Sequence, residues 1–265
     1  MSGHVSALSM GMMGLGALVC VLIPLALLLY YRKKGADILP FFVGCGVFVV
    51  FALLLESLVH NLVLKALPVG EKILGNTLLY ALYGGLAAGV FEETGRFLAF
   101  RTVLKQRLGN DRNALMYGAG HGGIEAVLLL SATYISYLAM AFMINAGKSE
   151  VLTATLAGDA LEQMKTLLNG LTENPAWVYL LAVVERVVAI TTHICLSVLV
   201  WFAAKKPGKG WLYPLAILLH AAFDGAAVLL AARLPLAAVE GCLVVMALGL
   251  VLLARRVWIG NAEPE

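Results

Sequence analysis

The sequence carries little charge. Charged residues make up 13% of its 265 residues, whereas a soluble domain typically has about 25%. Hydrophobic residues make up 61%, and several apolar stretches reach the roughly 20 residues that a helix needs to cross a bilayer. This composition excludes an ordinary soluble protein and predicts a polytopic protein embedded in a lipid bilayer. The net charge of +3 gives no reason to expect a nucleic-acid partner.

Paired cysteines and internal repeats are also missing. The four cysteines, Cys20, Cys45, Cys195 and Cys242, all lie inside apolar runs, and no CxxC occurs. This pattern excludes a disulfide framework and a cysteine-based zinc site. No internal repeat supports an inverted-repeat transporter. No basic segment precedes the first apolar run, so we interpret that run as a retained span rather than a signal peptide.

The lengths of the apolar runs predict an all-α fold, a polytopic transmembrane helical bundle of about seven spans in one domain covering 1–265. The expected spans are 8–31, 38–64, 75–101, 113 to 140–146, 176–204, 211–232 and 236–254. The polar connection at 147–175 has leucines at helical spacing. It predicts an amphipathic helix on the outer membrane surface, serving as a connector or as a lid.

The basic residues predict the orientation of the bundle. With the N-terminus outside, the cytoplasmic segments hold twelve lysines and arginines and the outer segments hold five. The twelve are Arg32, Lys33, Lys34, Arg101, Lys105, Arg107, Arg112, Lys205, Lys206, Lys209, Arg255 and Arg256, and the five are Lys65, Lys72, Lys148, Lys165 and Arg233. Because basic residues concentrate in cytoplasmic loops, we expect N-out and C-in.

The third expected span contains the stretch 91–96, in which Glu92 and Glu93 are followed by Arg96. A charge at membrane depth costs several kcal/mol unless it is paired or lines a wet cavity, so such residues indicate function by default. Three further spans also carry polar residues inside apolar runs. These are His121 with Glu125, His193, and His220 with Asp224.

Four of these residues fall at one depth. Glu92, His121, His193 and His220 each lie eight to eleven residues from the expected cytoplasmic end of their span. At 1.5 Å per residue, all four lie about 12–17 Å from that boundary. Unrelated structural polar residues would scatter in depth, so this agreement predicts a single site within a core at about 75–232. The pairs Glu56–His60 and Glu185–Arg186 lie nearer the outer face, and we interpret both as structural.

Helical spacing places the members of each pair on one face. Three pairs are four residues apart: Glu92 and Arg96, His121 and Glu125, and His220 and Asp224. Two glycine pairs have the same spacing, Gly85–Gly89 and Gly118–Gly122. Such glycines let helices approach closely, which lets short side chains from different helices meet one substrate atom or one metal ion.

Histidines and carboxylates in one buried layer suit hydrolysis. A catalytic zinc ion favours three protein ligands and a water, and imidazole is a common ligand. Candidate metal ligands are His121, His193, His220 and Glu125. Glu125 or Asp224 is expected as a fourth ligand or as a group that orients an imidazole.

Either glutamate of the motif is a candidate base. Glu92 or Glu93 would take the proton from the zinc-bound water. Without a metal, Glu92 would activate water together with His121, while His220 and Asp224 would stabilise the oxyanion. The site's depth indicates that water reaches it from the cytoplasmic side.

Three motifs resemble those of a known superfamily. Glu92-Glu93-x-x-Arg96, Tyr117-x-x-x-His121 and His220-x-x-x-Asp224 look like the motifs of the CAAX-protease and bacteriocin-processing superfamily. They are most similar to the YhfC-type branch of intramembrane metalloproteases, which is related to the PrsW proteases. The EExxR spacing departs from the EExxxR of the CAAX branch and is nearer the PrsW pattern. Prenylated proteins are therefore not the expected substrates.

The resemblance implies a peptidase that cleaves membrane-embedded or membrane-associated proteins or peptides in the bacterial cytoplasmic membrane. By motif position, the expected catalytic residues are Glu92, Glu93, Arg96, His121, His220 and Asp224, and the spacing argument adds Glu125. The motifs are compatible with catalysis with or without zinc. They do not specify the substrate or the oligomeric state.

Three other functions use the same residues. A proton-coupled transporter would use the acids and histidines as relay groups, and it predicts pH-dependent flux without a cleavage product. A b-type haem protein would use paired histidines as iron ligands and would show a Soret band. A non-catalytic scaffold would keep the polar core for stability alone.

Overall fold

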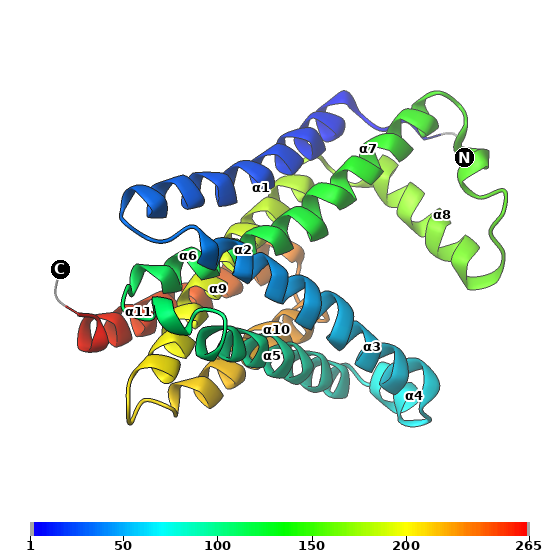
Figure 1. Cartoon of the computed structure of the whole chain (residues 1–265). Helices are drawn as coiled ribbons and strands as arrows, with labels where there is room; N and C mark the ends of the chain where they lie inside the picture. The colour runs from blue at the N-terminus through cyan, green and yellow to red at the C-terminus, as the bar shows by residue number, and fades with distance from the viewer. Residues whose placement is uncertain (1–2, 264–265) are drawn as a thin grey trace. The chain divides into compact units, whose positions relative to one another are not determined.

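The computed structural model describes residues 3–263, and that range is helical with no strand (Figure 1). The elements in chain order are α1 (Ala7–Lys33), α2 (Leu39–Val47), η1 (Phe48–Glu56), α3 (Ser57–His60), η2 (Asn61–Ala66), α4 (Val69–Leu74), α5 (Thr77–Arg101), η3 (Lys105–Arg107), α6 (Arg112–Ala126), η4 (Val127–Ser131), α7 (Ala132–Asn145), η5 (Ser149–Leu152), α8 (Gly158–Glu173), α9 (Trp177–Lys205), α10 (Leu212–Ala231) and α11 (Leu236–Asn261). The prediction of an all-α fold is confirmed.

Six helices are long and apolar enough to cross a membrane. They are Ala7–Lys33, Leu39–Ala66, Arg112–Asn145, Trp177–Lys205, Leu212–Ala231 and Leu236–Asn261. The second and third of these are continuous helices interrupted by π-helical turns at η1, η2 and η4. The second is visible in Figure 1 as the blue run that carries the labels α2 and α3. All six coincide with predicted spans.

The seventh predicted span forms α5 but is not among the six. It has 25 residues, which at 1.5 Å per residue is about 37 Å and long enough to span. Its two glutamates and two arginines reduce its mean hydropathy below that of the other spans. The count of seven spans, the orientation and the single domain therefore stay predictions.

One predicted boundary differs from the structure. The last helix was expected to end at 254, but α11 continues to Asn261 and includes Arg255 and Arg256. The segment 147–175 contains the expected helix as α8, which buries Leu168 and Leu171. Its expected place on a membrane surface is not tested by these contacts.

The chain separates into two compact units, and the boundaries fall inside helices. The first unit comprises 1–23 and 126–186, and the second comprises 24–125 and 187–265. Within the first, the Asn145 side chain accepts the Val5 N–H at 2.8 Å and donates to the Val5 carbonyl at 3.0 Å. The Tyr134 hydroxyl donates to the Tyr179 carbonyl at 2.7 Å. These bonds join segments that lie far apart in sequence.

In the second unit, glycines bring two helix pairs into close contact, as predicted. A Cβ added at Gly89 of α5 would lie 2.6 Å from the Ile217 carbonyl of α10. One added at Gly122 of α6 would lie 2.8 Å from the Ile190 Cα of α9. Real side chains do not tolerate such distances, so only glycine permits these packings. They set the spacing of the four helices that carry the candidate site.

A core of aromatic residues lies beside these helices in the second unit. Phe100 of α5, Tyr117 of α6 and Trp201 of α9 are buried and pack edge to face, with ring centroids 4.7 and 5.0 Å from Phe100. Burying such side chains stabilises a fold by several kcal/mol each. The core therefore provides a rigid base for the polar residues that follow on the same helices.

Candidate active site

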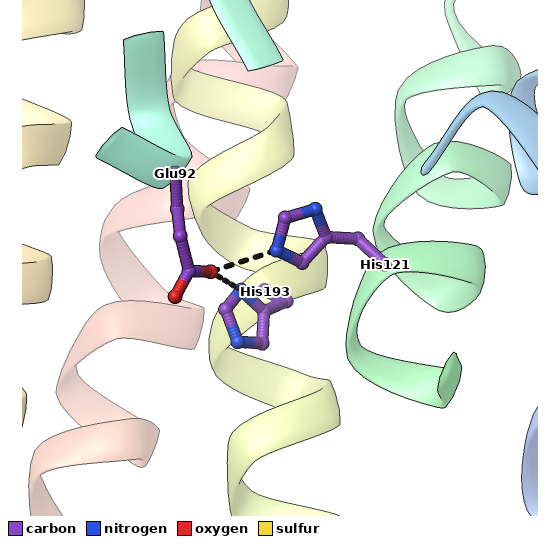
Figure 2. A group of neighbouring side chains, drawn as sticks. All are labelled: Glu92, His121 and His193. Atoms are coloured by element: carbon purple, nitrogen blue, oxygen red, sulfur yellow. Dashed lines mark hydrogen bonds and ion pairs between the residues drawn. The ribbon is translucent and has the colours of Figure 1, made fainter. Parts of the chain in front are cut away.

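Glu92 lies at the centre of the polar cluster in the second unit. It sits on α5, whose first turn is capped by the Asn76 side chain accepting the Leu79 N–H at 3.1 Å. Figure 2 shows its carboxylate facing the imidazoles of His121 and His193, which come from α6 and α9. The carboxylate is therefore held between three helices.

Three imidazoles each direct one ring nitrogen at the Glu92 carboxylate. His121 Nε2 lies 2.7 Å from Oε2, His193 Nδ1 lies 3.9 Å from Oε2, and His220 Nε2 lies 4.0 Å from Oε1. All three rings are buried. The structure thus brings the three imidazoles to the Glu92 carboxylate. These are the four residues that the sequence places at one depth.

Two of the imidazoles each contact another carboxylate from behind, that is, through the ring nitrogen that faces away from Glu92. His193 Nε2 lies 2.6 Å from Glu125 Oε2, and His220 Nδ1 lies 2.8 Å from Glu93 Oε1. A carboxylate that accepts the far N–H of an imidazole fixes its tautomer and leaves the near nitrogen with a lone pair. His193 and His220 thereby present lone pairs toward Glu92.

Arg96 is fully buried and joins three parts of the cluster. Its Nη1 forms an ion pair with Glu93, and its Nη2 donates to His193 Nδ1 at 3.1 Å. Its guanidinium also lies 5.8 Å from the centre of the Tyr117 ring. The sequence placed Arg96 on the same helix face as Glu92, four residues away. The ion pair that the structure shows uses the three-residue spacing to Glu93, and the Glu92 carboxylate faces the histidines.

Aromatic rings hold His121 in place. Its ring centroid lies 5.4 Å from that of Phe48 in an edge contact, 6.0 Å from that of Tyr117 and 4.7 Å from that of His193. Within 3–263, its Nδ1 has no hydrogen-bond partner. His121 is therefore oriented by packing, whereas the other two imidazoles are oriented by carboxylates.

Asp224 lies at the exposed edge of the cluster. Its Oδ2 is 3.5 Å from His220 Nε2, and 42% of its side chain is accessible. A carboxylate exposed in the middle of an apolar helix is expensive in lipid, so it must face water or a polar partner.

The donor atoms fit a metal ion. Among the residues that the structure describes, Glu92, His121 and His193 offer three ligand atoms within 4.8 Å of one another. A tetrahedral zinc site with bonds of about 2.1 Å separates its ligand atoms by about 3.4 Å. The Glu92 oxygen lies 2.7 Å from His121 Nε2 and 3.9 Å from His193 Nδ1, on either side of that separation. His193 Nδ1 is available only when Arg96 releases it.

Glu125, a predicted metal ligand four residues after His121, contacts the far nitrogen of His193. Its role as a ligand stays a prediction. The carboxylate that lies among the near nitrogens is that of Glu92. The physical reason is that α6 turns Glu125 toward α9, behind the imidazole rather than in front of it.

The cluster has more negative than positive charge. Four carboxylates, those of Glu92, Glu93, Glu125 and Asp224, lie near one guanidinium. Isolated charge inside a membrane protein is costly, and a proton or a cation must offset it. A divalent cation held by the imidazoles would supply two positive charges where the carboxylates are most concentrated.

Glu56 and His60 of the second unit form the pair that the sequence predicts. Glu56 ends η1, and its Oε1 lies 3.0 Å from His60 Nε2. The structural role predicted for this pair stays a prediction.

Comparison with known proteins agrees with the motifs. Residues 19–245 match the YhfC intramembrane metalloprotease family. The chain is 38% identical over 218 residues to a Bacillus subtilis protein named "Uncharacterized membrane protein YhfC", covering 82% of this chain and 83% of the relative. No solved structure matches the chain. This chain belongs to the YhfC intramembrane metalloprotease family.

Proposed function

We propose that this protein is an intramembrane peptidase that hydrolyses peptide bonds of membrane-embedded or membrane-associated proteins. The observation that carries the proposal is the convergence of three imidazole nitrogens on the Glu92 carboxylate. Membership of a family of intramembrane metalloproteases supports the same reaction class. By its basic residues, the site lies toward the cytoplasmic side of a bacterial cytoplasmic membrane. Relation to the PrsW and CAAX proteases stays a prediction.

The proposed ligands of a zinc ion are His121 and His193, two members of the group that could hold a metal, together with His220, whose Nε2 lies 4.0 Å from Glu92 Oε1. Glu92, the third member of that group, is kept for the role of base. The near nitrogens of the three imidazoles surround one carboxylate, and carboxylates fix two of the rings. When bound, zinc supplies Lewis acidity, which polarises a carbonyl oxygen and makes water a better nucleophile at neutral pH. Imidazole donors with orienting carboxylates are typical of zinc rather than of calcium or magnesium.

Glu92 is the proposed general base. Both oxygens of Glu93 are engaged, one by Arg96 and one by His220. The Glu92 carboxylate instead faces the position where a water and a peptide carbonyl would meet the imidazoles. Glu92 would take the proton of the attacking water and deliver it to the leaving amine. Positioned acid–base groups of this kind contribute about 10²–10⁴ to a rate.

The other site residues have supporting roles in this proposal. Glu93 and Glu125 hold the imidazoles of His220 and His193 in the ligating tautomer. Arg96 neutralises Glu93, so that a buried glutamate can stay ionised beside the site. Asp224, at the exposed edge, contacts the arriving backbone or its water.

Metal content tests the ligand assignment. We expect about one zinc per chain in the purified protein, and loss of zinc in His193→Ala and His220→Ala. His4→Ala is the matched control, because His4 lies in the exposed segment before α1. Mass spectrometry of the metal and circular dichroism of the fold are measured together. Folded protein without zinc in the wild type would contradict a metallopeptidase.

Cleavage tests the base. Quenched fluorescent peptides with one apolar span, reconstituted with the protein in liposomes, report hydrolysis directly. Glu92→Gln is expected to keep zinc while losing about 10²–10⁴ in rate. Loss of zinc in this variant would make Glu92 a ligand instead. Unchanged cleavage would overturn the assignment, and pH-dependent flux without any product would favour the transporter.

A further inference from the structure

A second hydrogen-bonded chain in the same unit leads away from the candidate site. Glu56 is buried, with 11% of its side chain accessible, and its Oε1 lies 3.0 Å from His60 Nε2. It closes the π-helical segment η1. Such segments are rare in helices and occur frequently at functional sites.

His60 connects Glu56 to a neighbouring helix. Its Nδ1 lies 2.9 Å from the hydroxyl of Tyr83 on α5. A neutral imidazole donates from one nitrogen and accepts at the other. With the Tyr83 hydroxyl donating to Nδ1, Nε2 donates to Glu56, and both nitrogens of His60 are satisfied. Glu56 and His60 lie in one predominantly apolar span, and Tyr83 lies on the next.

Exposure rises along this chain. The Glu92 side chain is 9% accessible, that of Glu56 is 11%, and that of His60 is 32%. Tyr83 is half-buried. The helix that carries Glu56 packs along α5, because a Cβ added at Gly95 would lie 2.6 Å from Phe51 Cγ and His60 contacts Tyr83. Glu56 lies between these two contacts on its helix, and Glu92 lies between them on α5, so the buried end of the chain lies at the level of the site. The chain therefore runs from the site to the protein surface within the bilayer region.

The chemistry of the proposed reaction needs such a route. Hydrolysis breaks the C–N bond, adds the water oxygen to the carbonyl carbon, and yields a carboxylate and an ammonium. One water is consumed per bond and no net proton is released, so the buried site must be resupplied with water. Apolar surroundings exclude water, whereas a line of satisfied polar groups with spare acceptor sites retains it.

We propose that Glu56, His60 and Tyr83 line a hydrated path that supplies water to the candidate site, an inference that rests on the proposed peptidase function. Tyr83 lies six residues after Thr77, so the path opens about 9 Å from that end of α5. Arg101 lies at the other end of α5, on the predicted cytoplasmic side. The path therefore opens toward the outer side, whereas the depth of the site predicts that water enters from the cytoplasmic side. His60 and Tyr83 are positioning residues for water in this proposal, and they do not touch the reacting atoms.

Thiol accessibility tests the path without any cleavage assay. In lipid nanodiscs, which expose both membrane faces, His60→Cys and Tyr83→Cys are treated with a charged methanethiosulfonate reagent. Leu58→Cys and Leu62→Cys are matched controls on the same span, because both leucines are exposed on the apolar surface. The thiolate is the reactive form and apolar surroundings suppress it, so labelling at His60 and Tyr83 should exceed the controls by at least about tenfold.

Kinetics test the role of the path. His60→Leu should lower kcat by about tenfold with KM unchanged, since substrate contacts are intact. His60→Gln, which keeps a donor and an acceptor, should restore most of the rate, and both variants should keep their zinc. Equal labelling at His60 and Leu58 would overturn the path, and a wild-type kcat in His60→Leu would overturn its role in water supply. If the thiols are labelled as expected but the protein cleaves no peptide, the peptidase function is rejected and the hydrated path is retained.

Discussion

Two buried polar clusters in the second unit invite comparison. In the first, the candidate site, carboxylates outnumber the single guanidinium of Arg96. In the second, which we call the terminal cluster, Asp111 Oδ1 accepts from Lys205 Nζ and from Trp201 Nε1, each at 2.8 Å. Glu263 adds a 2.9 Å ion pair to the same lysine and donates its backbone N–H to Asp111.

The two clusters differ in the groups that face their carboxylates. In the terminal cluster, Asp111 and Glu263 share the ammonium of Lys205, and the Glu263 side chain is 59% accessible. In the candidate site, three imidazole nitrogens face the Glu92 carboxylate, while the guanidinium of Arg96 pairs with Glu93. Imidazoles and carboxylates are metal ligands, whereas an ammonium is not. We therefore expect the terminal cluster to be structural and the candidate site to be chemical, and this comparison can be tested on both sides.

The largest effect is expected for Glu93→Gln. This change leaves the fully buried Arg96 without its counter-ion and weakens the hold on His220. A broken buried pair costs about 3–5 kcal/mol, and loss of an orienting carboxylate costs about 10–100-fold in metal affinity. Thermal unfolding and zinc titration measure the two effects.

Glu125→Gln is the matched control for that variant. Glu125 also holds an imidazole from behind. The zinc affinity of the Glu125→Gln protein should therefore fall by a similar factor, while its stability falls less. Equal loss of stability in the two variants would show that Arg96 does not depend on Glu93.

A smaller effect, and only on stability, is expected for Asp111→Asn. The amide keeps the shape and one acceptor, but Lys205 loses its nearest carboxylate, and Glu263 remains as a partner. We expect about 1–3 kcal/mol of destabilisation, with zinc content and kcat unchanged. A kcat loss in a folded Asp111→Asn protein would break the distinction between the two clusters.

The smallest effect is expected for Asp37, in the loop before α2. A hydrogen bond from Asn113 at 2.9 Å, with Arg107 at 3.2 Å, lowers the pKa of the Asp37 carboxyl below its ordinary value despite partial desolvation. Because folding lowers the pKa of Asp37, its carboxylate stabilises the folded protein at pH values above the unfolded pKa of about 3.9. It is lost as the pH falls through the folded pKa.

Asp37→Asn should therefore lower Tm by about 1–2 °C at pH 7. The difference from wild type should shrink as the pH falls through the lowered pKa of Asp37, and it should vanish where the carboxyl is protonated in the folded protein. Thermal scans in detergent across this range measure it. A difference that persists at low pH would mean that the hydrogen bond, rather than the charge, stabilises the loop.

Periodicity and motif spacing predicted much of this protein. The lengths of the apolar runs predicted helices to within a few residues for most spans, because a bilayer-crossing helix must be both long and apolar. The depth of Glu92, His121, His193 and His220 predicted that they meet, because residues at one depth on adjacent helices share one layer. Gly89 and Gly122 predicted close packing, because a glycine lacks the Cβ that would clash with the neighbouring helix at these positions.

The sequence by itself therefore determined the helices, the layer of polar residues and the family motifs, since each depends on local spacing along one chain. Only the tertiary structure decided which charges pair. Arg96 forms its ion pair with Glu93, Glu125 lies behind His193, and Glu56 contacts His60, which in turn contacts Tyr83 of α5. Helix rotation sets these partnerships, because a turn of 100° between adjacent residues moves a side chain from one neighbouring helix to another. That rotation is fixed by packing between helices, which spacing along one helix does not report.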